Sequence, residues 1–185
     1  MTKQKSKRAS IRIATAADVP AIAAVVNSAF AIETFHDGTR TDEKNIAELM
    51  GIGEFLIMEN EGGRILASVY VEVRGERGYF GMFAVEPSYQ GHGLARLTVE
   101  AAENHCRSHG CEYIDFKVLS PRTVLLPFYH RLGYIETGTE EFPSLPHLKE
   151  GMECHFILMS KKLDADSMTK INALDDKYHC FLSVV

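Results

Sequence analysis

The sequence predicts an α/β domain of the mixed α+β type, with a central, mostly antiparallel sheet of about seven strands and about four helices. Two kinds of pattern support this class: short runs in which apolar and polar residues alternate, and longer runs in which apolar residues recur every three or four positions. Four strand patterns come before the long helix of the second half, and three follow it. The 185 residues, 45% of them hydrophobic, suffice for one domain with a buried core.

The first 50 residues are expected to form one strand and two helices. Residues 11–15 alternate in hydrophobicity, and Thr15 with Asp18 then has the spacing of a capping box, with Asp in place of the usual Glu or Gln. Helical spacing over residues 16–31 predicts the first helix, with apolar side chains at Val19, Ile22, Val26 and Phe30. A weaker pattern over residues 44–50 predicts the second helix.

Three neighbouring strands are expected next. Residues 54–60 and 64–74 are apolar-rich runs separated by residues 61–63, Glu-Gly-Gly, an arrangement typical of a β-hairpin. A short polar loop leads to a third run at residues 79–85. Because short loops join consecutive strands in antiparallel fashion, these three strands are expected side by side.

The long helix of the second half begins after Gly93 and ends at Gly110, a residue type that accepts the left-handed backbone found after helix C-termini. Its buried stripe is expected to consist of Leu94, Leu97, Ala101 and His105. Residues 111–119 then alternate with period two and predict a strand. Since a single helical crossover joins this strand to the run at residues 79–85, the two strands are expected to be parallel.

The last elements are a short helix and two strands. Residues 126–132 can form a helix with Pro127 in its first turn and Gly133 after its end. Residues 134–139 and 154–163 are the remaining strand candidates.

These elements place the domain at residues 11–163, after a disordered basic tail over residues 1–10. Residues 164–185 fit a tail, an additional helix or an edge strand equally well. A homodimer that pairs through the apolar end, residues 181–185, is one hypothesis for the assembly.

Charge and composition argue against several function classes. The net charge of −5 does not favour nucleic acid as a partner, and no run approaches the ~20 apolar residues that span a bilayer. Without a signal-peptide pattern, a soluble cytoplasmic protein with reduced cysteines is expected. His105 and His109 could share a metal by their spacing, but Cys111 lies beyond Gly110 and no second ligand pair follows, so no metal site is expected.

Residues 85–97, VEPSYQGHGLARL, place two glycines around a histidine where the long helix starts. A helix N-terminus carries unpaired N–H groups and the positive end of the helix dipole, and glycine lets an anion approach the main chain. The P-loop and Rossmann spacings are both absent, because no lysine follows Gly93 and the third glycine is missing. The stretch predicts a phosphate or pyrophosphate held by the main chain of Gln90, Gly91, His92, Gly93, Leu94 and Ala95.

Two motifs resemble the GNAT superfamily of acyl-CoA N-acyltransferases. Residues 85–95 match that family's [QR]xxGx[GA] loop after a strand ending in V-x-P, and residues 128–134, FYHRLGY, match its FYxxLG[FY] signature. The resemblance covers residues 11–163 and implies a GNAT-like sheet that is splayed after the fourth strand, with helices on both faces.

The resemblance also implies acetyl-CoA as cosubstrate and assigns residues to it. The main chain of Phe83, Ala84 and Val85 would pair with the pantetheine arm and polarise the thioester carbonyl. Tyr129 would be the general acid for the departing thiolate, since a phenol is protonated at neutral pH. Arg122 stands where the family often has Asn, and it is a candidate contact to a coenzyme phosphate.

The general base is left open by the sequence, because residues 79–85 carry no carboxylate. Glu33 and His36, which follow the first helix, and Glu72 on the preceding strand are candidates, and a chain of water molecules is the alternative. Acceptor recognition is expected in the variable segments 33–41 and 142–152.

The sequence thus predicts an N-acetyltransferase that moves an acetyl group from acetyl-CoA to a primary amine of a small molecule or peptide by direct attack in a ternary complex. Two alternatives remain: an O-acetyltransferase and a non-catalytic acyl-CoA-binding module.

Overall fold

The computed structural model describes residues 9–31, 38–141 and 154–164, and over these ranges the chain forms one seven-stranded sheet in the order β1-β2-β3-β4-β5-β7-β6. The strands are β1 (Ala9–Ile13), β2 (Glu54–Asn60), β3 (Ile65–Arg74), β4 (Arg77–Val85), β5 (Tyr113–Leu119), β6 (Ile135–Glu141) and β7 (His155–Lys162). The α-helices of the described residues are α1 (Val19–Phe30), α2 (Glu43–Met50), α3 (Leu94–Ser108) and α4 (Leu126–Arg131). The mixed α+β class is confirmed.

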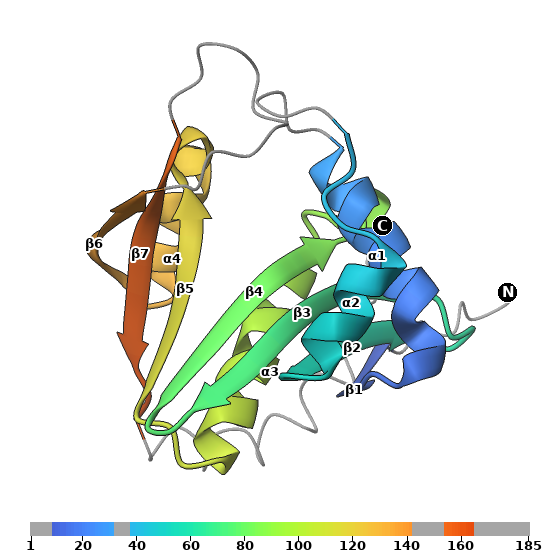
Figure 1. Ribbon diagram of the computed structural model, residues 1–185, viewed down its shortest axis with the longest axis horizontal. Coiled ribbons are helices and arrows are strands. Elements are labelled where there is room, and N and C mark those ends of the chain that lie inside the picture. The colour runs from blue at the N-terminus through green and yellow to red at the C-terminus, as the bar shows by residue number, and fades with distance from the viewer. Residues whose placement is uncertain (1–8, 32–37, 142–153, 165–185) are drawn as a thin grey trace, which may run out of the picture.

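All neighbouring strands pair in antiparallel fashion except β4 and β5, which are parallel. The expected parallel crossover through α3 is therefore confirmed. Figure 1 shows β1 to β4 on one side and β5, β7 and β6 on the other, joined near one end of β4 and β5 and spread apart toward the other end.

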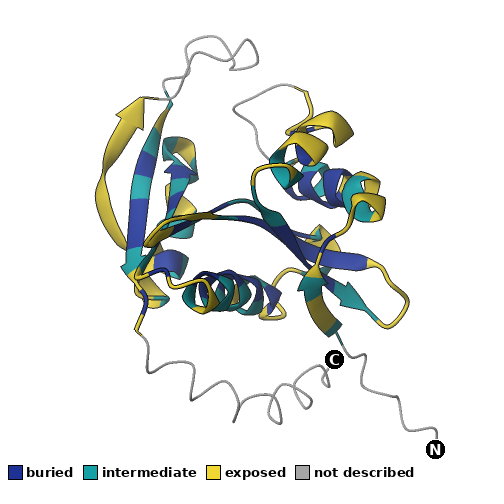
Figure 2. Cartoon of the chain, turned by 60° about the horizontal axis from the view of Figure 1, so that its bottom comes forward, coloured by how far each residue is buried: buried dark blue, intermediate teal, exposed yellow. Residues whose placement is uncertain are grey.

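Helices cover both faces of the sheet, as Figure 2 shows, with α1 and α2 on one side and α3 on the other. The period-two alternation of β3 produces this arrangement, because successive side chains of a strand point to opposite faces. Tyr70 packs in the cluster with Ile22 and Val26 of α1, whereas Val69 packs in the cluster with Val99 of α3. Each face therefore has its own apolar core.

The N-terminal elements begin close to where the sequence places them. β1 starts at Ala9, two residues before the expected strand, and a 3₁₀ turn (Ala16–Asp18) comes before α1. The Thr15 N–H donates to the Asp18 carboxylate at 2.7 Å, as in a capping box. That carboxylate also accepts two hydrogen bonds of 2.8 Å from Arg12, so a single residue connects β1 to the helix start.

The expected buried stripe of α3 is wrong in its centre. Leu97, Ala101 and His105 are only partly buried, whereas the buried side chains are Leu94, Thr98, Val99, Ala102, Glu103 and Cys106. Two of these are polar residues that find partners inside the protein. Thr98 donates to the Leu94 carbonyl at 2.8 Å, and Glu103 accepts hydrogen bonds from Tyr134 and Lys161.

Some expectations fall outside the described residues. They concern residues 1–8 of the basic tail expected over residues 1–10, the segment 142–153 and the C-terminal residues 165–185. Residues 9 and 10 of the expected tail instead belong to β1. Among the helices that the structure describes, none is long and apolar enough to cross a membrane.

Candidate functional site

The opening between β4 and β5 is the central feature of the candidate site. These parallel strands pair only at Arg77 with Tyr113, Gly78 with Ile114, and Tyr79 with Asp115. Beyond Tyr79, β4 continues to Val85 without a partner on its β5 side (Figure 1). The main chain of this part of β4 is therefore an unpaired edge in the middle of the sheet.

A β-bulge interrupts β4 within this edge. Ala84 lies opposite Ser68 and Gly81 lies opposite Tyr70, so two residues of β4, Met82 and Phe83, face a single residue of β3. Met82 has a φ of 45°, which is uncommon for a side chain other than glycine. Bulges with such backbone angles redirect main-chain groups and occur often beside active sites.

The ladder with β3 shows which main-chain groups face the opening. The Glu86 N–H donates to the Leu66 carbonyl at 2.8 Å, and Ala84 lies directly opposite Ser68. Because such pairs alternate along an antiparallel ladder, the groups of Ala84 face β3, whereas the Val85 N–H faces the open edge. Of the three residues that the sequence nominates here, Val85 has its N–H toward the opening, Ala84 has its groups toward β3, and Phe83 lies in the bulge.

The glycine loop follows at the end of β4 and leads into α3. Gly91 and Gly93 both have a φ of 82°, and a Cβ atom built on either would meet no atom within 4 Å. The loop is fixed from within, since Gln90 Nε2 donates to the Val85 carbonyl at 3.2 Å and His92 Nδ1 lies 2.9 Å from the Gln90 carbonyl. The space in front of the two glycines is therefore open while their backbone is held.

The N–H groups of this loop have no acceptor among the described residues. This holds for five consecutive residues, Gly91, His92, Gly93, Leu94 and Ala95. Unpaired N–H groups at a helix N-terminus, with open space before them, fit a phosphate or pyrophosphate group. Of the six residues that the sequence nominates, Gln90 differs, because its N–H donates to the Pro87 carbonyl at 3.3 Å. The anion site at Gly91 to Ala95 stays a prediction.

Tyr129 is the fourth residue of the short helix α4, and it is 6% exposed. Its ring centroid is 4.3 Å from that of Phe116 on β5, and its hydroxyl has no hydrogen-bond partner among the described residues. Desolvation raises the pKa of Tyr129 to about 12, and the charge of Arg122 opposes that rise. The phenol is therefore kept protonated and is able to donate.

Arg122 lies in the 3₁₀ helix (Ser120–Leu125) between β5 and α4. Its guanidinium carbon is 5.1 Å from the ring centroid of Phe30, the last residue of α1, and the guanidinium carbon of Arg40 is 5.4 Å from the same ring. Arg122 therefore joins the two sides of the opening through cation–π contact.

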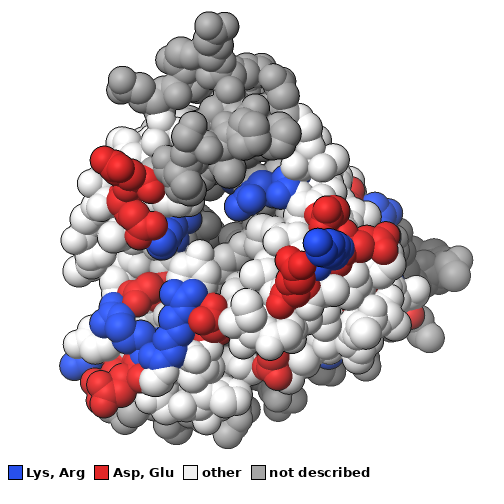
Figure 3. Space-filling model, in the orientation of Figure 1, with Lys and Arg blue, Asp and Glu red and all other residues white. Residues whose placement is uncertain are grey.

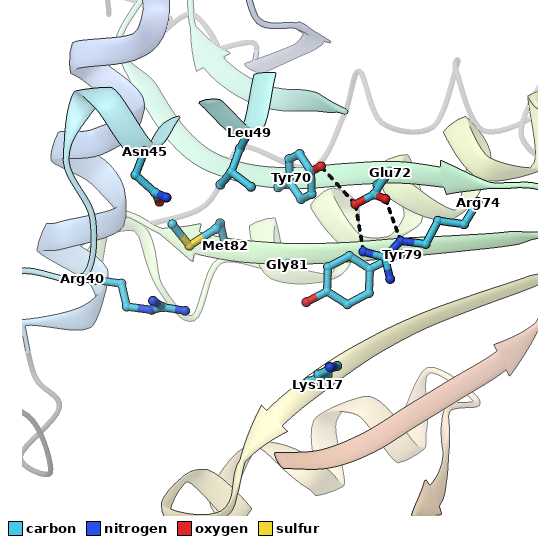
Figure 4. A pocket seen from close by; sticks show the side chains of 10 residues that line it. All are labelled: Arg40, Asn45, Leu49, Tyr70, Glu72, Arg74, Tyr79, Gly81, Met82 and Lys117. Atoms are coloured by element: carbon cyan, nitrogen blue, oxygen red, sulfur yellow. Dashed lines mark hydrogen bonds and ion pairs between the residues drawn. The ribbon is translucent and has the colours of Figure 1, made fainter. Parts of the chain in front are cut away.

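A pocket of about 320 Å³ lies on the face that carries α1 and α2 (Figure 4). It is lined by Arg40, Asn45, Leu49, Tyr70, Glu72, Arg74, Tyr79, Gly81, Met82 and Lys117. Gly81 and Met82 lie within the open part of β4, so this pocket reaches the same strand that leads into the glycine loop.

Glu72 lines this pocket but is engaged with other side chains. Its two carboxylate oxygens accept hydrogen bonds of 2.7 and 2.8 Å from Arg74, and one accepts a further bond of 3.1 Å from the Tyr70 hydroxyl. The hydrogen bonds from Arg74 lower the pKa of Glu72. The other nominated bases, Glu33 and His36, lie outside the described residues.

The pocket also contains residues that sequence reasoning did not nominate. Tyr70, Tyr79, Met82 and Lys117 come from three different strands. Because side chains alternate between the two faces of a strand, Tyr70 and Glu72 of β3 could be predicted to share a face. Their proximity to Lys117 of β5 could not be predicted from the local sequence.

The cluster of histidines and cysteines lies at the opposite end of α3 from the glycine loop. The His105 and His109 ring centroids are 4.4 Å apart, His105 Nε2 is 3.1 Å from a Glu54 carboxylate oxygen, and Cys106 and Cys111 are buried free thiols. In the described ranges, no group of three His, Cys, Asp or Glu side chains is arranged to hold a metal ion.

Comparison with known proteins agrees with this geometry. Residues 23–134 match the acetyltransferase (GNAT) family. N-alpha-acetyltransferase 30 from Saccharomyces cerevisiae is 37% identical over 59 residues, 32% of this chain and 34% of that protein, so the match spans about a third of the curated relative.

Solved structures share the fold at low sequence identity. The ribosomal-protein-S18-alanine N-acetyltransferase from Escherichia coli superposes with a TM-score of 0.69 at 18% identity, over 85% of this chain and 95% of that chain. YncA from Salmonella typhimurium, solved with acetyl-CoA, gives a TM-score of 0.64 at 22% identity, with the same coverage of 85% and 95%. The family match over most of the described sheet, together with the shared fold, leads to one conclusion: this chain belongs to the acetyltransferase (GNAT) family.

Proposed function

We propose that this protein is an N-acetyltransferase that moves an acetyl group from acetyl-CoA to a primary amine of a small molecule or peptide, by direct attack in a ternary complex. The observation that carries the proposal is the run of five N–H groups without an acceptor, Gly91 to Ala95, directly after the unpaired edge of β4. The yeast relative, an N-alpha-acetyltransferase, and the Salmonella structure with acetyl-CoA support the same reaction class.

Residues of the loop and of β4 would hold the coenzyme. The N–H groups at the start of α3 would donate to its pyrophosphate, with Gly91 and Gly93 leaving room for the phosphate oxygens. The open edge at Phe83 and Val85 would pair with the amides of the pantetheine arm, as an added strand pairs with a sheet edge. The Val85 N–H is the donor that would polarise the thioester carbonyl.

When it is bound, acetyl-CoA supplies an acetyl group already activated as a thioester. A C–N bond to the amine forms, the C–S bond breaks, and the sulfur takes up a proton. Tyr129 is proposed as the donor of that proton, since burial keeps its phenol protonated and its hydroxyl has no partner in the described part of the chain.

The amine must also lose a proton, and the base remains one of the candidates named from the sequence. Glu72 is the weakest of these, because its bidentate ion pair with Arg74 lowers its pKa and so reduces its affinity for a proton. Glu33, His36 and a chain of water molecules are the other proposals.

The test is thiol release from acetyl-CoA in the presence of a panel of amines, each paired with the corresponding alcohol. Thiol release with amines alone is the expected result, and mass analysis of the product should show one added acetyl group. Release with alcohols alone would replace the proposal with O-acetylation. Binding of acetyl-CoA without release across the panel would favour a binding module.

A further inference from the structure

Glu103 of α3 is a charged side chain inside the protein. Ionised side chains are mostly exposed, and Figure 3 shows charged side chains of both signs on the surface of one face. The Glu103 side chain, by contrast, is 4% exposed and belongs to the buried face of its helix. A carboxylate in such a place is costly unless its oxygens accept hydrogen bonds. Its partners therefore show what it holds in position.

Three side chains donate hydrogen bonds to this carboxylate. The Tyr134 hydroxyl donates to Oε1 at 3.0 Å, and Lys161 Nζ lies 2.8 and 2.9 Å from the two oxygens. Arg107, one helical turn further along α3, donates from Nη2 to Oε2 at 3.1 Å. Glu103 therefore connects α3 to β7 and to Tyr134, which lies between α4 and β6.

This cluster fixes the position of the Tyr134 ring. Lys161 Nζ lies 5.4 Å from the centroid of that ring, so the same ammonium contacts both the carboxylate and the phenol. A buried ion pair often adds little net stability, because desolvation offsets much of the attraction. In addition, Arg107 Nε is buried without a hydrogen-bond partner among the described residues. The defined position of Tyr134 is thus the clearest consequence of the cluster.

Tyr134 is in direct contact with Tyr129, the proposed proton donor. The Tyr134 N–H donates to the Tyr129 carbonyl at 3.1 Å, and the two ring centroids are 6.2 Å apart at an interplanar angle of 83°. Both rings also pack against Phe116 of β5, with centroid distances of 5.0 Å for Tyr134 and 4.3 Å for Tyr129. The main chain and the ring of Tyr129 are therefore both supported by Tyr134.

The helix α4 needs such support to keep Tyr129 in place. It has six residues, all of them described, and Tyr129 is the one that is buried. Isolated helices shorter than ~12–15 residues are marginal in water, so contacts with the rest of the protein set the position of α4. The contacts of Tyr129 with Tyr134 and Phe116 belong to this set.

The hydroxyl groups of the two tyrosines differ in their partners. Desolvation raises the pKa of Tyr129 to about 12, and desolvation followed by the charge of Glu103 raises the pKa of Tyr134 well above its usual value. Both phenols are therefore protonated at neutral pH. The Tyr134 hydroxyl donates its proton to Glu103, whereas the Tyr129 hydroxyl has no partner in the described part of the chain. Tyr134 is thus suited to hold a position and Tyr129 to donate a proton.

We propose that Glu103 is a positioning residue for the reaction: through Tyr134 it holds Tyr129 at a fixed place relative to α3, the helix whose first N–H groups would bind the coenzyme. The inference rests on the proposed acetyltransferase function and adds a residue to the same site. A general acid must lie within hydrogen-bond reach of the departing sulfur. A displacement of Tyr129 by about 1 Å therefore lowers the rate even though the donor is still present.

Tyr134→Phe is the first test, because it removes the hydrogen bond to Glu103 and keeps the ring. The FYxxLG[FY] signature accepts Phe at this position, so the variant is expected to fold. The kcat for thiol release should fall about tenfold, while the Kd for acetyl-CoA and the KM for the amine should change by less than about twofold. An unchanged kcat in the folded variant would overturn the proposal.

Two substitutions at Glu103 test the other end of the hydrogen bond. Glu103→Met has a similar length and no strong acceptor, so it should lower kcat as much as Tyr134→Phe does. Glu103→Gln keeps an oxygen that can accept from the Tyr134 hydroxyl, and it should retain more activity than Glu103→Met. Glu100→Gln is the control, since it removes the 2.7 Å ion pair of another α3 carboxylate with Arg96, and it should keep full kcat. Equal losses in Glu103→Gln and Glu103→Met would contradict a role through Tyr134.

A double-mutant cycle shows whether the effect passes through Tyr129. If Tyr134 acts by placing the Tyr129 hydroxyl, Tyr134→Phe should lower kcat by less than about twofold in a protein that already carries Tyr129→Phe. A purely structural role of Tyr134 would give the same loss in both backgrounds. A further tenfold loss in the Tyr129→Phe background would therefore exclude the positioning role.

A measurement without turnover separates this inference from the proposed function. In protein labelled with ¹³C in its tyrosine rings, the NMR signal of Tyr129 is identified by its absence from Tyr129→Phe. Tyr134→Phe and Glu103→Met should shift or broaden this signal, and Glu100→Gln should leave it unchanged. An unchanged Tyr129 signal in the first two variants would refute the positioning role even in an active enzyme. Shifted signals in a protein that releases no thiol with any amine would leave the link from Glu103 to Tyr129 and refute the acetyltransferase. The thermal midpoint of each variant checks that it is folded.

Discussion

Tyr79 of β4 and Asp115 of β5 are the last paired residues of the parallel ladder, and beyond them the two strands separate. This separation leaves the edge of β4 unpaired, with the glycine loop at the end of that strand. The pocket with Arg40 and Lys117 adjoins the same strand on the α1 and α2 face. The unpaired edge and the pocket are therefore two separate features of one strand.

The glycine loop gives the first prediction. Gly93→Glu should abolish the thermal stabilisation by acetyl-CoA, because the added carboxylate occupies the open space and repels a phosphate. Gly63→Glu is a matched control, since Gly63 also has a positive φ, 74°, and open space, but lies in the β2–β3 hairpin. The control should lose stability and keep the response to acetyl-CoA. Normal stabilisation of folded Gly93→Glu would rule out the phosphate site.

Removal of the Tyr129 hydroxyl tests the proton donor. Tyr129→Phe should lower kcat by about 100-fold or more, the contribution typical of a general acid, with little change in the affinity for acetyl-CoA. The control is Tyr113→Phe at the first residue of β5, where β4 and β5 are still paired, and this variant should keep full activity. Thiol-release kinetics with a good amine substrate measure both variants, and full activity of Tyr129→Phe would exclude the acid role.

Glu72→Gln tests the base assignment. The ion pair with Arg74 already lowers the pKa of Glu72, so this carboxylate is a poor proton acceptor at neutral pH. We expect kcat to fall by less than about tenfold, whereas loss of a true general base costs roughly 100- to 10,000-fold. A larger loss, together with disappearance of the acidic limb of the pH–rate profile, would instead make Glu72 the base.

Asp18 gives a prediction for stability against pH. The hydrogen bonds from Arg12 hold the pKa of Asp18 well below its usual range. A lowered pKa contributes stability that is present above the unfolded value of about 4 and is lost as the pH falls toward the folded value. Asp18→Asn should therefore lower the thermal midpoint at pH 7, and the difference should shrink progressively below pH 4. A difference that is constant from pH 7 to pH 3 would contradict this account.

Much of the fold and part of the site follow from local sequence. The tight turn at Gly91 and Gly93 can be predicted, because glycine adopts a positive φ with little strain. Tyr129 follows from a motif whose spacing is fixed by a short helix between Pro127 and Gly133. In these cases the residues that determine the structure are close together in the chain.

Other parts depend on contacts between distant segments. Met82 has a positive φ within the bulge, where two residues of β4 lie opposite one residue of β3, and nothing in the local sequence predicts this bulge. The buried face of α3 contains two polar residues, Thr98 and Glu103, whose side chains form hydrogen bonds inside the protein. A prediction based on hydrophobic residues alone therefore chose the wrong face of the helix, centred on Leu97 and Ala101. Arg40, Tyr79 and Lys117 likewise line one pocket only because the folded sheet brings distant segments of the chain together.

The most direct test of the central claim is the thermal unfolding midpoint with and without acetyl-CoA. A ligand at a hundred times its dissociation constant stabilises the folded state by about 2.7 kcal/mol, which gives a clear upward shift. We predict this shift for the wild-type protein and for Gly63→Glu. No shift at millimolar acetyl-CoA would contradict the claim that the edge of β4 and the loop at Gly91 and Gly93 form a coenzyme site.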